Sequence, residues 1–259
     1  MGKWMRRIVM GLLLAVFVLS AGSIAVIQRQ YQADETFYID AAQRYLSVQK
    51  QKENMESGYG DMIRYDQEET APIRVDFVSL QAVNSDVIGW IYCEDTVINY
   101  PILKGADNDI YLHRTYEGGY SKAGSIFVDA ANQWDFADSN TIVYGHHMNN
   151  GSMFASLQDW LGQEFYEKHP VMWLLTPQQD YKIVLFSGYT VSAYSDTYTI
   201  FTGPCEEFTD YLAGCVERSA FHADVELNEK GCYVLLSTCA YMFENARYVL
   251  HGMLVPVNR

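Results

Sequence analysis

The chain has 259 residues, of which 49% are hydrophobic and 14% are aromatic, and its formal net charge at pH 7 is −14. Four of the 18 basic residues and none of the 32 acidic residues lie within residues 1–29, so the rest of the chain carries a net charge of −18. This balance argues against nucleic acid as a partner, because binding a phosphate backbone requires basic patches. About 230 residues after that first segment suffice for one domain with a sizeable core and an appendage.

The first predicted element is a membrane-spanning helix over Ile8–Ile27, a stretch without a charged side chain. At a rise of about 1.5 Å per residue, a helix of this length crosses a bilayer core of about 30 Å. Basic residues flank it unequally: Lys3, Arg6 and Arg7 precede it, and Arg29 follows. The positive-inside rule then predicts a single-pass protein of the cytoplasmic membrane, with residues 1–7 as a cytoplasmic tail and the remaining chain outside.

A cleaved secretory signal is the alternative for this segment. Small residues near Ala21–Ala25 would suit a cleavage site, but the apolar run is longer than the usual 7 to 15 residues. Both alternatives export the same domain. We expect the anchor to occupy residues 8–27.

Residues 28–71 are expected to form an extracellular helical stalk and linker. Apolar residues recur there at helical spacing, namely Phe37, Ala41, Ala42, Tyr45 and Leu46, before the charged stretch Lys50–Thr70. A further helix is expected to begin at Pro72 and to end at Asn84. The rest of the domain, to residue 259, should carry the function.

Short β-rich runs separated by turn residues dominate the remainder of the chain. They are Val87–Tyr92, Val97–Leu103, Gly124–Asp129, Thr141–Tyr144, Met172–Thr176, Tyr181–Thr190, Cys232–Cys239 and Tyr248–Val257. Two helices should interrupt them, at Met153–Trp160 and Cys205–Ser219. The second has one apolar face, formed by Phe208, Tyr211, Leu212, Cys215 and Val216. Eight such runs predict a β-barrel in a mainly β, α+β domain with peripheral helices.

The five cysteines form no CxxC pair, and their odd number leaves at least one thiol free in an exported protein. We therefore expect no disulfide framework. Metal binding is also not expected, because the His146–His147 pair has no Cys, Asp or Glu at a ligand-like spacing. Most of the cysteines are expected to be small buried residues.

Three segments can carry chemistry. The run from Thr141 ends in a Gly-His-His turn that presents His146 where strand becomes loop. The apolar run from Tyr233 ends in Ser237, Thr238 and Cys239, and Arg247 opens the next run eight residues later. Their co-occurrence is more specific than any one of them.

A cysteine thiol with an ordinary pKa of about 8.5 is only slightly ionised at neutral pH, so a nucleophilic Cys239 needs a partner that takes its proton. His146 suits this task and could later protonate a departing amine. Attack on a peptide carbonyl creates an oxyanion, and Arg247 offers permanently charged donors for it. Ser237 is expected to contact substrate, and Thr238 to assist the oxyanion through its hydroxyl or the following amide.

Together these segments resemble a sortase of class B over roughly residues 72 to 259. The resemblance includes Asn84–Ile91, Val97–Ile102, Asp107–Leu112, Gly124–Asp129 and Gly145–Met148, and the helix at 205–219 resembles the long inserted helix of that class. One departure is Leu235, where the family pattern Thr-Leu-x-Thr-Cys begins with threonine. We expect Leu235 to pack in the core.

This resemblance implies a catalytic domain over residues 72–259, built as an eight-stranded barrel, in a Gram-positive bacterium. It implies that Cys239 cleaves a C-terminal sorting motif of secreted proteins, of the Asn-Pro-x-Thr kind or a related Pro-x-Thr-Gly sequence. A thioacyl enzyme forms and is resolved by an amine of a peptidoglycan precursor or cross-bridge peptide, or in some members by a pilin lysine. No metal or organic cofactor is implied.

Two other functions remain open from the residues alone. A hydrolytic cysteine peptidase would use the same groups, and an inactive surface-tethered binding module would share the fold. Alternation along an extended segment predicts that His147 points away from His146. The other histidines, His113, His169, His222 and His251, lie in no motif, and Arg218 is expected to be a solvated charge on its helix.

Overall fold

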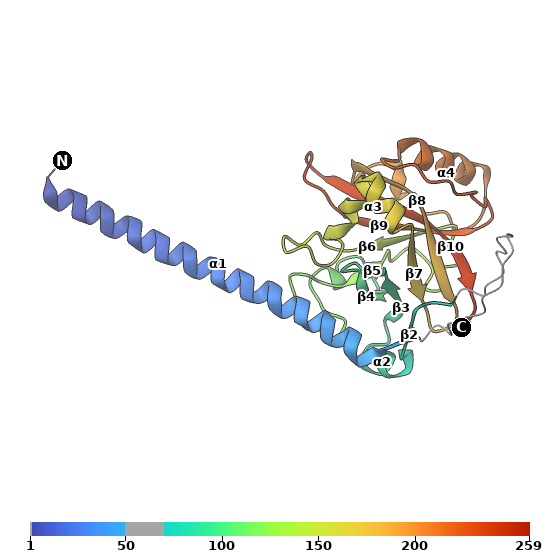
Figure 1. Cartoon of the computed structure of the whole chain (residues 1–259), viewed down its shortest axis with the longest axis horizontal. Helices are drawn as coiled ribbons and strands as arrows, with labels where there is room; N and C mark the ends of the chain where they lie inside the picture. The colour runs from blue at the N-terminus through green and yellow to red at the C-terminus, as the bar shows by residue number, and fades with distance from the viewer. Residues whose placement is uncertain (1, 50–69) are drawn as a thin grey trace, which may run out of the picture. The chain divides into compact units, whose positions relative to one another are not determined.

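The computed structural model describes residues 2–49 and 70–259, and the chain divides into two units, Met1–Asp40 and Ala41–Arg259. The second unit is a closed barrel in the strand order β10-β8-β7-β3-β4-β5-β6-β9, with helices on its outside (Figure 1). Neighbouring strands are antiparallel except in the pairs β4–β5 and β6–β9. The predicted mainly β barrel with peripheral helices is confirmed.

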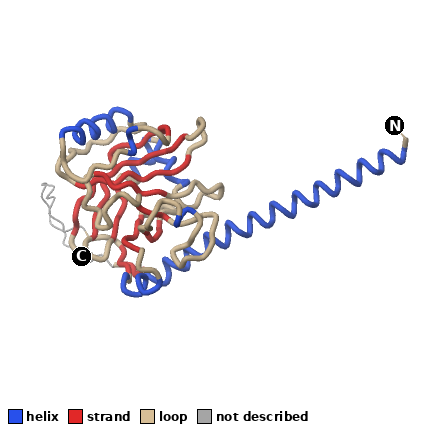
Figure 2. Tube along the Cα trace, turned by 180° about the vertical axis from the view of Figure 1, so that it is seen from behind, coloured by secondary structure: helices blue, strands red, loops and turns tan. Residues whose placement is uncertain are grey.

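Each of the eight predicted runs overlaps one barrel strand, and the strands form the red centre of Figure 2. Their bounds are β3 Val87–Tyr92, β4 Asn99–Leu103, β5 Ile126–Val128, β6 Asn140–Tyr144, β7 Val171–Leu175, β8 Asp180–Ser192, β9 Cys232–Cys239 and β10 Ala246–Val257. The longest pairing joins β8 and β10, which run side by side along their whole length.

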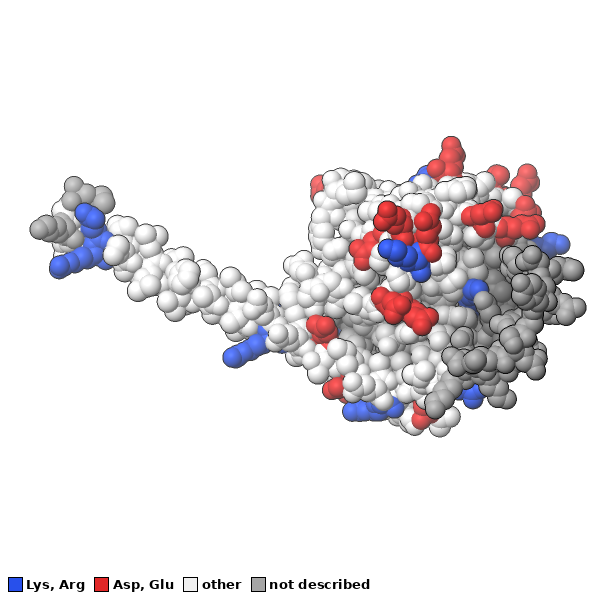
Figure 3. Space-filling model, in the orientation of Figure 1, with Lys and Arg blue, Asp and Glu red and all other residues white. Residues whose placement is uncertain are grey.

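The N-terminal segment is one helix, α1, which runs from Lys3 to Tyr45. Among the described residues, this helix is long and apolar enough to cross a membrane: its most apolar window has a mean hydropathy of 2.5 and no buried residue. Basic side chains gather at its start in Figure 3, and an uncharged stretch follows. The helical spacing predicted for the stalk holds to Tyr45, but Leu46 begins strand β1. The predicted linker falls largely on residues 50–69, outside the described residues.

The helix expected from Pro72 begins five residues later. Ile73–Val75 forms strand β2, which pairs with β1 (Leu46–Val48) in a two-stranded antiparallel sheet. Helix α2 then runs over Phe77–Val83, and the Asp76 side chain caps it by accepting a hydrogen bond from the Ser79 N–H at 3.0 Å. A side-chain cap defines the start of a helix better than a preceding proline does, which explains the wrong start.

The connections of the barrel contain short helical turns. These are η1 Ile110–Leu112, η2 Ala155–Leu161, α3 Gln163–Lys168 and η3 Asp196–Tyr198. The helix expected at Met153–Trp160 is instead the 3₁₀ helix η2. It cannot begin at Met153, whose φ of 58° lies outside the helical region. Helix α3 was not predicted.

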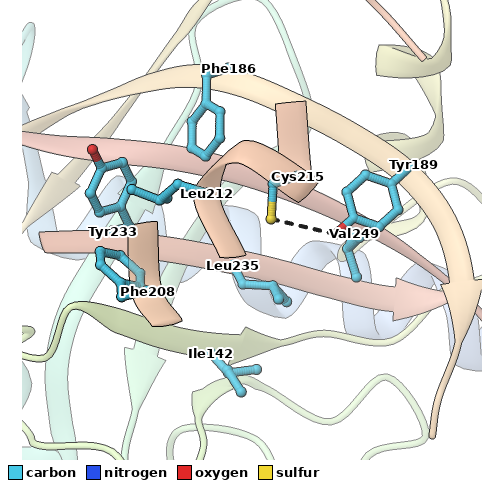
Figure 4. Packing of buried hydrophobic residues seen from close by; sticks show 9 residues of the cluster. All are labelled: Ile142, Phe186, Tyr189, Phe208, Leu212, Cys215, Tyr233, Leu235 and Val249. Atoms are coloured by element: carbon cyan, nitrogen blue, oxygen red, sulfur yellow. Dashed lines mark hydrogen bonds between the residues drawn. The ribbon is translucent and has the colours of Figure 1, made fainter. Parts of the chain in front are cut away.

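The long helix α4 (Glu206–Arg218) covers the outer face of β8, β9 and β10. Figure 4 shows the cluster beneath it, in which Phe208, Leu212 and Cys215 of α4 meet side chains of the sheet. Leu235 belongs to this cluster and is fully buried, as expected for the position that departs from the family pattern. Val216 was assigned to the apolar face but is 48% exposed, because it lies at the edge of the helical stripe.

All five cysteines are free thiols, and Cys93 and Cys215 are buried as expected. The expectation is wrong for Cys205, which is exposed, and for Cys232, which is half-buried. Acidic side chains gather on the barrel unit around α3 and α4 in Figure 3. Cys239 is half-buried at the end of β9, in contrast to the buried thiols.

Candidate active site

Strand β9 carries the half-buried Cys239 at its C-terminal end and lies between β6 and β10. In the antiparallel pairing with β10, Arg247 lies directly opposite Cys239. In the parallel pairing with β6, Tyr144 lies opposite Ser237, and the Gly145 N–H donates to the Ser237 carbonyl at 3.1 Å. The strand direction then carries the chain from Tyr144 to His146 and from Ser237 to Cys239. Sheet pairing therefore brings His146 to the end of the barrel where Cys239 and Arg247 lie.

The three side chains share one face of the sheet, because alternate residues of a strand point to the same side. Residues further along that face, Ile142, Leu235 and Val249, pack under α4 in the buried cluster. The apolar part of the face is thus covered by a helix, and its polar end is left open. This explains why the runs predicted from sequence change from apolar to polar at these positions.

A pocket of about 320 Å³ opens at this polar end. His146, Cys239 and Arg247 all line it, together with Asn108, Asp109, Leu112, Phe127, Tyr144, Gly145, Ser237 and Thr238. Asp129 links two of the lining residues: its Oδ2 accepts hydrogen bonds from the Tyr144 hydroxyl at 2.9 Å and from Asn108 Nδ2 at 3.0 Å. The pocket is large enough for a few residues of a peptide.

His146 is held by a backbone carbonyl. Its Nε2 lies 2.8 Å from the Leu112 oxygen. A carbonyl only accepts, so Nε2 carries the proton, and in the neutral ring Nδ1 is the nitrogen that can accept another. Burial lowers the pKa of His146, the Leu112 carbonyl opposes that shift, and the nearby His113 lowers the pKa further. The ring is therefore neutral at neutral pH and is suited to accept a proton.

Arg247 donates from Nη1 to the carbonyl of Ala246 at 3.0 Å. Within residues 2–49 and 70–259, no carboxylate forms an ion pair with its guanidinium. The charge of Arg247 acts on the nearby Tyr198 hydroxyl. Burial raises the pKa of Tyr198, and the positive charge of Arg247 opposes that rise. A guanidinium without a carboxylate partner keeps donors available for a substrate.

Ser237 and Thr238 differ in orientation. Ser237 shares the face of Cys239, and its Oγ lies 2.7 Å from the Tyr198 hydroxyl. Thr238 is 2% exposed, and its Oγ1 has no hydrogen-bond partner among the described residues. Thr238 lies opposite Tyr248, whose buried hydroxyl likewise lacks a partner in the described part of the chain. Thr238 thus borders the pocket with its side chain turned into the barrel.

The remaining candidates do not line this pocket, but His147 lies close to it: burial lowers the pKa of His147, and a hydrogen bond with the Cys239 backbone opposes that shift. His147 lines a different pocket with Asp159 and packs edge-on against Tyr241, as alternation predicts. Arg218 is exposed on α4, as expected, and it also stacks over Tyr189 at 5.0 Å and contacts Asp196. His251 is buried beneath α4 with its Nδ1 3.9 Å from the Cys215 sulfur.

Three residues that line the pocket or contact its side chains were not predicted from sequence. Tyr198 comes from η3 and stacks on Tyr144 with ring centroids 6.4 Å apart. Leu112 acts through its backbone oxygen, for which a sequence contains no signal. His113 was assigned to no site, yet its ring stacks on His146. Each of these residues lies in or next to a short helical turn between strands, whose path the sequence pattern does not define.

Comparison with known proteins agrees with this fold. No protein-family model matches the chain. The sortase B of Listeria monocytogenes is 38% identical over 187 residues, which cover 71% of this chain and 75% of that protein. The sortase B of Staphylococcus aureus is 34% identical over 190 residues, which cover 72% of this chain and 77% of that protein.

Solved structures show the same similarity. Sortase B from Bacillus anthracis in complex with AAEK1 superposes with a TM-score of 0.71 at 33% identity, covering 88% of this chain and 99% of that one. A Staphylococcus aureus sortase B–substrate complex superposes with a TM-score of 0.66 at 32% identity, covering 70% and 85%. The barrel and these similarities define a sortase, which is a cysteine transpeptidase. Within that family, the chain belongs to class B.

Proposed function

We propose that Cys239 is the nucleophile of this transpeptidase, that His146 transfers the proton and that Arg247 stabilises the oxyanion. Nδ1 of neutral His146 takes the thiol proton as the sulfur attacks the carbonyl carbon of the scissile peptide bond. Arg247 donates to the oxygen that becomes negative. The imidazolium then protonates the departing amine, the C–N bond breaks, and a thioacyl enzyme forms.

The second half of the reaction reverses these steps with a new amine. Nδ1 of His146 removes a proton from the incoming amine, which attacks the thioester carbon. The C–S bond breaks, the sulfur recovers its proton, and a new peptide bond remains. The observation that carries the proposal is the convergence of thiol, imidazole and guanidinium on one pocket.

We propose as substrates secreted proteins with a C-terminal sorting motif, Asn-Pro-x-Thr or a related Pro-x-Thr-Gly sequence, cleaved after the threonine. The accepting amine would belong to a peptidoglycan precursor or cross-bridge, or to a pilin lysine. Structures of related sortase B enzymes in complex with a substrate and with triglycine support this proposal by analogy. The open polar end of the pocket suits an extended peptide.

We further propose that residues 1–7 are cytoplasmic, that residues 8–27 anchor the chain in the cytoplasmic membrane, and that residues 28–71 connect this anchor to the extracellular catalytic domain at 72–259. The apolar, unburied part of α1 supports the anchor, and the preceding basic residues support the orientation.

The first experiment looks for the thioacyl enzyme. The full-length chain in detergent is incubated with a panel of Pro-x-Thr peptides, and intact mass spectrometry detects an adduct. Cys239→Ala should abolish the adduct, whereas Cys205→Ser, which removes an exposed thiol at the start of α4, should retain it. An adduct on Cys239→Ala would refute the nucleophile.

The paired histidines allow a matched test of the proton carrier. His146→Ala should reduce turnover by about 10²- to 10⁴-fold, the usual contribution of a general acid–base group. His147→Ala should retain substantial activity because this ring faces another pocket. If His147→Ala lost more activity than His146→Ala, His147 rather than His146 would be the proton carrier.

The alternative of a hydrolytic peptidase uses the same residues and is separated by product analysis. Peptide is turned over with and without an added amine such as triglycine, and the products are identified by mass. Ligated product supports transfer, and exclusive hydrolysis at saturating amine contradicts it.

A further inference from the structure

A second imidazole lies against the proposed proton carrier. The rings of His113 and His146 are stacked, with centroids 5.7 Å apart and planes inclined by 14°. His113 directly follows Leu112, whose carbonyl accepts the Nε2–H of His146. One short segment therefore contacts the His146 ring both at its edge and over its face.

This segment is held firmly by the barrel. The Tyr111 hydroxyl donates to Asp86 Oδ2 at 2.6 Å and accepts from Asn84 Nδ2 at 3.0 Å. The Ser125 N–H donates to the Tyr111 carbonyl, and the Ser121 N–H donates to the His113 carbonyl, each at 3.0 Å. The backbone on both sides of Leu112 is thereby fixed, and the His113 ring, although exposed, contacts the rings of His146 and Tyr120.

We propose that His113 is a positioning residue for the transpeptidase reaction, which with the Leu112 carbonyl keeps the His146 ring oriented toward the Cys239 thiol. The inference rests on the role proposed above for His146. A stacked aromatic ring restricts the tilt of its partner, while the carbonyl restricts its rotation and selects the tautomer with a free Nδ1.

Charge adds to this positioning. The titratable and charged groups that line the His146 pocket are Asp109, Tyr144, Cys239 and Arg247. His113 lines a neighbouring cavity with Asp107, Asp109, Arg114 and Tyr120. Burial is the main cause that lowers the pKa of His146, and His113 is the group whose charge lowers it further. His113 is exposed and His146 is partly buried, and a positive charge on the stacked His113 ring would disfavour a second one on His146. His146 thus stays neutral to lower pH than it would alone.

An NMR titration tests this without relying on turnover. The histidine Cε1–H signals of the full-length chain in micelles are followed with pH, and His146 is assigned by its loss in His146→Ala. His113→Phe keeps a stacked ring but removes its charge, and should raise the pKa of His146 by about 0.5 unit. His222→Phe, which replaces an exposed histidine outside the pocket, should leave it unchanged.

A second measurement isolates the positioning. The rate of Cys239 alkylation by iodoacetamide is followed between about pH 5 and 9. His113→Ala, which loses the stack, should slow alkylation at neutral pH several-fold more than His113→Phe does. The inference is overturned if His146 titrates within about 0.1 unit of the parent in His113→Phe. The inference is also overturned if Cys239 of the His113→Ala variant is alkylated by iodoacetamide at the same rate as in the parent protein. Absence of a peptide adduct together with a shifted His146 would refute the proposed function and leave the pairing of the two rings standing.

Discussion

Arg247 and Cys239 are direct cross-strand partners on β10 and β9. Side chains at directly opposed positions of an antiparallel pair have Cβ atoms about 5 Å apart and point to the same face. The positions of Arg247 and Cys239 are therefore fixed next to each other by the register of two strands rather than by a flexible loop. This relationship supports the role proposed for Arg247 in the chemistry at Cys239.

Replacing Arg247 should reduce catalysis rather than stability. Arg247→Ala should lower kcat by about 10²- to 10³-fold, the cost of losing an oxyanion donor, and Arg247→Lys should recover only part of it because lysine lacks the planar fork. Steady-state kinetics with a Pro-x-Thr peptide measure both effects. Unchanged kcat in Arg247→Ala would contradict the assignment.

Arg218→Ala is the matched contrast to these variants. It loses the stack on Tyr189 and the contact with Asp196. It should lower the free energy of unfolding by about 1 kcal/mol with little change in kcat. Denaturant unfolding and the same kinetic assay measure the two quantities.

The carbonyl that holds His146 depends on Gly124. Its φ is +57°, and a Cβ there would overlap the Leu112 oxygen and the Tyr111 oxygen. Gly124→Ala should therefore displace the Leu112 carbonyl and reduce both stability and acylation rate. Gly118 also has a positive φ, of +87°, but a Cβ there would meet no atom within 4 Å, so Gly118→Ala reports backbone strain alone. Thermal unfolding and adduct formation should be measured for both variants, and Gly124→Ala should lose more stability and acylation rate than Gly118→Ala. Equal losses in the two variants would show that backbone strain, and not displacement of the Leu112 carbonyl, is the cause.

Stability should fall in acid because of His251. Burial lowers the pKa of this histidine to about 3, whereas the unfolded chain has an ordinary value of about 6.5. Between these values the unfolded state binds the extra proton, so the contribution to stability is fully present above about pH 6.5 and is lost as pH falls, by up to about 1.4 kcal/mol per pH unit. Urea unfolding at neutral and mildly acidic pH should show a flatter dependence for His251→Phe than for the parent. The exposed His222→Phe should keep the parent slope, and a parent slope in His251→Phe would argue against this source.

Ser237 and Thr238 should respond differently to loss of the hydroxyl. The Thr238 hydroxyl is buried without a partner among the described residues, so Thr238→Val should raise the free energy of unfolding by about 1 kcal/mol and leave acylation intact. Ser237 binds the Tyr198 hydroxyl beside the pocket. Ser237→Ala should leave that hydroxyl without its partner and increase KM for the peptide. Kinetics and denaturant unfolding of both variants test the contrast, and a loss of kcat in Thr238→Val would restore a catalytic role to its hydroxyl.

Local pattern was sufficient for most of the secondary structure. The eight β-rich runs could be located because alternating and apolar stretches between turn residues are a property of a few neighbouring residues. The start of α2 and the nature of the turn at Ala155–Leu161 were missed, since they depend on the Asp76 side-chain cap and on the backbone angle of Met153. Residue type alone does not specify either feature.

The order of the amino acids was enough to propose three groups for the reaction: a thiol, an imidazole and a guanidinium, each at an end of an apolar run. How these groups meet depends on the folded barrel, because strand order and register are set by packing across the whole domain. The fold also supplies the Leu112 carbonyl, the Tyr198 hydroxyl and the stacked ring of His113. These contacts form where the segments between strands return to the barrel. Long-range contacts of this kind produce no repeating pattern of residue types, so they could not be predicted from the sequence.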